Sequence, residues 1–75
     1  MSMKEYVYAT FHSTTDSIKA EAAFKASEIK GRLVIIPREL SAGCGMAWRS
    51  EPEWQAQIEE VAKANEINLK QVAIL

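Results

Sequence analysis

Two segments with helical spacing of their apolar residues are each flanked on both sides by short β-type runs. This order of elements constrains the fold more than any other feature. Helices are predicted over residues 14–30 and from about residue 51 to residue 65. Aromatic and β-branched or alternating runs predict strands over residues 6–11, 33–36, 46–49 and 69–75. The order is strand, helix, strand, strand, helix, strand.

This order predicts an α+β protein of the ferredoxin-like, split βαβ type. The simplest closed arrangement is a four-stranded antiparallel sheet in the order 4-1-3-2, with both helices on one face. With 75 residues and no repeat, linker or low-complexity segment, residues 1–75 are expected to form one domain.

The strands carry cues to their place in the sheet. Val7, Ala9 and Phe11 alternate onto one face and are expected to face the core. The continuous apolar run 33–36 predicts a buried strand, and Pro37 directly after it points to an edge strand or to a strand end, which fits the edge position of the second strand in the predicted order. The face away from the helices is expected to be uncovered and to carry Tyr6 and Tyr8. Such a surface suits a partner or a second copy of the chain, which makes a homodimer possible.

The helices carry start, stop and packing signals. Ser13 is expected to cap the first helix, and Gly31 to end it in a left-handed conformation. Ser50, with Glu53 three residues later, is expected to cap the second helix. Helical spacing predicts the buried face of the first helix as Ile18, Ala22, Ala23, Ala26 and Ile29. It predicts that of the second as Trp54, Ile58, Val61, Ala62 and Asn65.

Cys44 is the only cysteine, and Gly43 and Gly45 flank it. Its bland interpretation is a small apolar residue in a turn. The functional interpretation is a reactive thiolate presented by a glycine-rich loop. In the predicted topology the first and second strands run the same way. The loop with Cys44 therefore emerges beside the start of the first helix.

Three features of that end of the sheet favour a thiolate: the helix N-terminus, His12 and Arg38. His12 is either a base or positive neighbour for the sulfur, or a loop residue bonded to backbone. Arg38 is either an anion or thiolate partner, or a solvated loop residue. Ser41 either donates a hydrogen bond to the sulfur or shapes the turn.

The motif P-R-E-L-S at residues 37–41, followed by C-G-M-A at residues 44–47, resembles the signature of a bacterial family, the "putative Se/S carrier protein-like" proteins. The resemblance extends over nearly the whole chain in length and element order. It implies a ferredoxin-like fold and a role as a carrier of sulfur or selenium. The atom would be held as a persulfide or perselenide on the cysteine that matches Cys44. Donor and acceptor proteins are then the implied partners. The C-P-x-P motif of SirA/TusA-type sulfur carriers is not found here.

Charge and length argue against several functional classes. Nine Lys and Arg balance ten Asp and Glu, which gives no basic footprint for nucleic acid. No apolar run approaches the roughly 20 residues that span a bilayer, so no membrane association is expected. A single thiol suits a reducing compartment, and a cytoplasmic location is expected. One Cys and one His do not make a structural zinc site, and no cofactor is expected.

Two alternatives to a carrier stay open. One is a non-catalytic interaction or oligomerisation module in which Cys44 is structural. The other, by fold analogy alone, is a small-molecule sensor. In the carrier interpretation the chain presents an atom to its partners rather than acting as a stand-alone enzyme.

Overall fold

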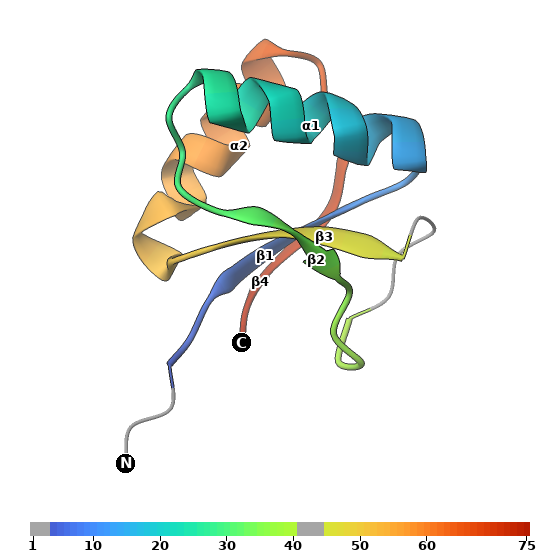
Figure 1. The fold of residues 1–75 in the computed structure, drawn as a ribbon, viewed down its shortest axis with the longest axis vertical. Coiled ribbons are helices and arrows are strands. Elements are labelled where there is room, and N and C mark those ends of the chain that lie inside the picture. Colours follow the sequence, from blue (N-terminus) through green and yellow to red (C-terminus); the bar gives the residue numbers. More distant parts are fainter. Residues whose placement is uncertain (1–3, 41–44) are drawn as a thin grey trace.

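The computed structural model describes residues 4–40 and 45–75 and contains a four-stranded sheet covered on one face by two helices (Figure 1). The sheet order is β2-β3-β1-β4, with every neighbouring pair antiparallel, which confirms the predicted ferredoxin-like α+β fold. The elements are β1 (Val7–Phe11), α1 (Thr14–Ala26), β2 (Arg32–Ile35), β3 (Met46–Ser50), the 3-10 turn η1 (Pro52–Trp54), α2 (Gln55–Ala64) and β4 (Leu69–Ile74).

The core lies between the central strands and the helices. Val7, Ala9 and Phe11 of β1 are fully buried there, as their alternation predicted. Trp48 of β3 is also fully buried, and its ring lies 5.1 Å from that of Phe24 on α1 at a tilt of 59°. Aromatic pairs of this kind contribute about 0.5–1.5 kcal/mol beyond the area they bury.

The predicted buried face of the first helix is confirmed at Ile29, which is buried just after α1, and at Ala23, which packs partly against the core, but it is wrong at the other positions. Ser17, Ala20 and Phe24 face the core, whereas Ile18 is 59% exposed and Ala22 and Ala26 are exposed as well. The alternative stripe is possible because the Ser17 hydroxyl donates a hydrogen bond to the Thr14 carbonyl and so is buried without loss of a partner. It is favoured because it buries the large Phe24 ring.

Both helices end in the same motif. The N–H of Ile29 donates to the Phe24 carbonyl and that of Ile67 to the Ala62 carbonyl, while Glu28 and Glu66 adopt positive φ values of 61° and 57°. These are Schellman caps, each with a buried isoleucine after the left-handed residue. The pentapeptide K-A-x-E-I at residues 25–29 and 63–67 encodes both ends.

The predicted helix stop at Gly31 is also wrong, because α1 ends at Ala26 and Glu28 takes the left-handed position. Gly31 instead meets the end of β3 at close range. A Cβ at Gly31 would clash with the Arg49 carbonyl oxygen and with Ser50 Oγ, and would lie 2.9 Å from Trp48 Cε2. Glycine is required here for space.

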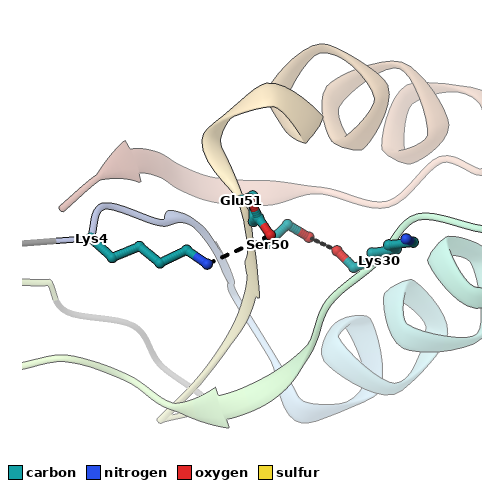
Figure 2. A network of polar contacts seen from close by, with 4 residues as sticks. All are labelled: Lys4, Lys30, Ser50 and Glu51. Atoms are coloured by element: carbon teal, nitrogen blue, oxygen red, sulfur yellow. Dashed lines mark hydrogen bonds and ion pairs between the residues drawn. The ribbon is translucent and has the colours of Figure 1, made fainter.

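Ser50 was predicted to cap the second helix, but it belongs to β3 and does not act as a cap. Its hydroxyl donates to the Lys30 carbonyl at 2.6 Å (Figure 2) and accepts from Trp48 Nε1 at 2.8 Å. The helical segment begins instead with Glu51 at the N-cap of η1, without a side-chain cap. The predicted cap at Ser13 is confirmed, because its hydroxyl accepts from the Asp16 N–H at 3.2 Å.

The buried stripe of α2 is confirmed for Ile58 and Ala62, with Trp54 and Val61 packed partly against the core. Asn65 is exposed and its side-chain amide donates to the Val61 carbonyl, so its predicted burial is wrong.

Strand β2 is an edge strand, as Pro37 predicted, but it is not the buried strand expected from its apolar run. Leu33 and Val34 are half-buried, and Ile35 is 81% exposed. An edge strand lacks a neighbour on one side, so an apolar run does not by itself imply burial.

The face away from the helices is covered at one end. Thr10 and Ala47 are register partners on that face, and both are fully buried. Figure 1 shows the segment that follows β2 on this side of the sheet, where Leu40 is 8% exposed although it lies outside the core cluster. The expectation of an uncovered face is therefore wrong here. At the other end, Tyr6 and Tyr8 are half-buried.

We expect Gly31→Ala to lower the free energy of unfolding by ~1–3 kcal/mol, because the added methyl group overpacks the junction with β3. Denaturant unfolding followed by tryptophan fluorescence measures this. Asn68→Ala, in the exposed segment after the second Schellman cap, is the control and should change stability little. A Gly31→Ala protein as stable as the control would show that the junction relaxes.

Candidate functional site

The candidate site lies at the end of the sheet where β1 and β2 finish and β3 begins. Both β1 and β2 are antiparallel to β3, so they run the same way and their following segments leave at one end. The Ile36 N–H donates to the Gly45 carbonyl at 3.0 Å, which extends the β2–β3 ladder one pair beyond the strands. Cys44 directly precedes Gly45 in the chain. Cys44, Ser41 and Gly43 lie outside the described residues.

The segment after β2 begins with a tight turn. The Leu40 N–H donates to the Pro37 carbonyl at 3.0 Å, which closes a β-turn with Arg38 and Glu39 at its centre. Both central residues are exposed, whereas Leu40 is buried. Residues 37–40 of the motif thus form a turn with a buried leucine anchor, and Arg38 is presented to solvent.

Gly45 has a positive φ of 74°, and a Cβ built on it would meet nothing within 4 Å. It is needed for its backbone conformation rather than for space, in contrast to Gly31. The prediction that a glycine beside Cys44 supports turn backbone is confirmed at this residue.

His12 lies between the end of β1 and the Ser13 cap of α1, and its side chain is exposed. The topology brings His12, the α1 N-terminus and Gly45 to the same end of the sheet. Within residues 4–40 and 45–75, no side-chain hydrogen bond or ion pair joins His12 to Arg38. The two residues share an end of the sheet, and in the described part of the chain neither bond of this kind links them.

Sequence reasoning missed two exposed apolar side chains at this end. Ile35 is the last residue of β2, paired with Met46, and Ile18 lies early in α1. The edge position signalled by Pro37 could have identified Ile35, because the end of an edge strand is poorly covered. Contiguous apolar patches mark contact surfaces, whereas single exposed apolar side chains are common on protein surfaces.

The described residues contain neither a candidate metal centre nor a candidate membrane-spanning helix. No group of three or more His, Cys, Asp or Glu side chains there is placed to hold a metal ion. None of the helices in that part of the chain is long and apolar enough to cross a membrane.

Fold and site together define a small ferredoxin-like protein whose one cysteine stands next to the glycine that opens β3. The model of the family described as "Putative Se/S carrier protein-like" matches residues 6–74, nearly the whole chain. The chain belongs to this family, which confirms the resemblance based on the motif around Cys44. No curated protein and no solved structure matches the chain.

Gly45→Ala should lower the free energy of unfolding by ~1–2 kcal/mol, because alanine is strained at positive φ. Gly45→Asn should cost less, since asparagine tolerates the left-handed region better. Thermal unfolding of the three proteins at matched concentration measures the order. A Gly45→Asn protein less stable than Gly45→Ala would contradict the backbone argument.

Proposed function

We propose that this protein carries sulfur or selenium as a persulfide or perselenide on Cys44. The main support for this proposal is the family match over residues 6–74, together with the presence of one cysteine in the chain. The description of the family supports the carrier role in general terms. The assignment to the Cys44 Sγ is our proposal.

Loading is a thiol exchange without net oxidation. The Cys44 thiolate attacks the terminal sulfur of a cysteine persulfide on a donor enzyme. An S–S bond forms on Cys44 while the donor's S–S bond breaks, and the donor cysteine leaves as a thiolate. Delivery repeats the exchange, with an acceptor nucleophile attacking the terminal sulfur. Selenium as a perselenide follows the same scheme.

The proposal gives roles to the residues around Cys44. The α1 N-terminus, with its partial positive charge, and the exposed His12 and Arg38 side chains supply the positive potential that favours a thiolate. In this proposal Ser41 donates a hydrogen bond to the sulfur. Gly43 and Gly45 leave both sides of the thiol open to partners.

A carrier must meet a donor and an acceptor in turn, so its thiol belongs beside an exposed contact surface. Ile35 supports this requirement, because it is 81% exposed at the end of β2, next to the segment that leads to Cys44. We propose that Ile35 contacts the donor during loading.

Incubation with a cysteine desulfurase and cysteine is expected to add one sulfur atom to the protein. Intact-mass analysis without reductant measures the gain, and dithiothreitol should reverse it. Cys44→Ser keeps the size of the side chain and should gain nothing. The absence of any gain on the wild-type protein, or an equal gain on Cys44→Ser, would contradict the carrier role.

The rate of Cys44 alkylation against pH separates a carrier from an interaction module with a structural cysteine. An activated thiol reaches its half-maximal alkylation rate at a pH below ~8.5, the pKa of a free cysteine. His12→Gln should move this midpoint to higher pH. Slow alkylation with a midpoint near that of free cysteine would favour the interaction module.

Ile35→Thr should raise the KM of desulfurase-dependent loading several-fold, because a partner loses an apolar contact, while stability changes little at this exposed position. Ile74→Thr is the matched control: the same chemical change on the other edge strand, near the opposite end of the sheet. Steady-state loading at varied carrier concentration measures both. Equal KM values for the two variants would exclude Ile35 from the contact.

A further inference from the structure

An open pocket of about 300 Å³ lies at the end of the sheet opposite to the Cys44 loop. Strands β1 and β2 begin there and β3 ends there, as the register pairs Val7 with Ser50 and Arg32 with Arg49. The residues that give the pocket its character are Lys4, Tyr6, Lys30, Arg32, Arg49 and Glu51. The carrier proposal assigns nothing to this region.

The charge of the pocket contrasts with that of the whole chain. Acidic residues slightly outnumber basic ones overall, yet four cationic side chains and one carboxylate line the pocket. Glu51 Oε1 lies 3.7 Å from Lys4 Nζ and pairs with it. Among the described residues, no carboxylate forms an ion pair with Lys30, Arg32 or Arg49. Within residues 4–40 and 45–75, three cations of the pocket therefore have no carboxylate paired with them.

The two arginines are arranged at a cost to stability. Arg32 and Arg49 are direct partners in the antiparallel ladder, so their side chains project from the same face. Like charges directly opposite in a sheet are destabilising. The Arg49 guanidinium lies 4.4 Å and Lys4 Nζ lies 5.5 Å from the centre of the Tyr6 ring, so both cations contact the same aromatic ring. An anion between these groups would relieve the repulsion.

The backbone below these cations is fixed in place. Ser50 bonds to the Lys30 carbonyl (Figure 2) and to the Trp48 indole, and Gly31 packs against the carbonyl of Arg49. These contacts lock the start of β2 to the end of β3. The two strand positions that carry the arginines are thereby preorganised, which lowers the entropy cost of binding a ligand.

We infer that this pocket binds a small molecule with a pyrophosphate-type polyanionic group. Arginine presents a planar fork that matches phosphate oxygens in pairs, and three unpaired cations suit a group with several negative charges. The volume is at the lower end for small-molecule sites, which fits a ligand of this size. The site is distant along the strands from the Cys44 loop and does not depend on the carrier chemistry.

Isothermal titration calorimetry with pyrophosphate tests the inference, on wild-type protein and on Cys44→Ser. Saturable binding to both is expected, so a failure of the carrier role leaves this result unchanged. Arg32→Gln/Arg49→Gln should weaken binding at least ~10-fold, because charge-assisted hydrogen bonds are lost. Lys19→Gln/Lys63→Gln removes the same net charge from exposed helix positions and should retain wild-type affinity. No saturable binding to wild type, or equal loss in both double variants, would overturn the inference.

Amide chemical-shift mapping provides a readout that does not need a variant. Pyrophosphate should shift the amides of Gly31, Arg32 and Arg49 and leave those near Gly45 unchanged. Titration with citrate tests whether carboxylates replace phosphates. Tighter binding of citrate, or shifts concentrated away from the pocket, would overturn the assignment of a phosphate ligand.

Discussion

The hydroxyl of Ser50 joins the buried core at Trp48 to the connection between α1 and β2. It accepts from the indole of Trp48, the largest fully buried side chain, and donates to the carbonyl of Lys30 between α1 and β2. Trp48 in turn packs on Phe24, so one side chain links β3, α1 and the entry into β2. A buried indole N–H without a partner would cost about 1–3 kcal/mol, and Ser50 removes that cost. The hydrogen-bonded geometry also explains why position 31 has no room for a side chain.

The fold was predictable from the sequence because its strongest signals are local. Val7, Ala9 and Phe11 alternate, Pro37 marks an edge, and the element order leaves few topologies. The buried face of α1 was not predictable in the same way. Two stripes fit helical spacing, and the choice between Ile18 and Phe24 depends on the shape of the sheet below. Ser50 was misassigned because a serine before a helix resembles a cap, and only the position of Lys30 shows its other role.

Part of the site was also predictable. The sequence Gly43-Cys44-Gly45 predicted turn backbone, and Gly45 has a positive φ of the kind that glycine permits. Strand direction alone predicted that the segments after β1 and after β2 leave the sheet at the same end. The sequence did not show that Leu40 would be buried in the turn motif, or that Ile35 would be exposed. The burial of Leu40 and the exposure of Ile35 both depend on which face of the edge strand the following segment packs against. This is a long-range property that the local sequence pattern does not contain.

The two ends of the sheet meet different demands, and the glycines show this. Gly45 serves a loop that must turn sharply beside a thiol, so its φ matters and its surroundings are open. Gly31 serves a junction that must be tight, so its surroundings matter. The tight junction supports opposed arginines that repel each other, and a rigid backbone is what allows such a pair to persist. The proposed ligand site therefore depends on the link through Ser50 and Trp48, which holds the start of β2 against the end of β3.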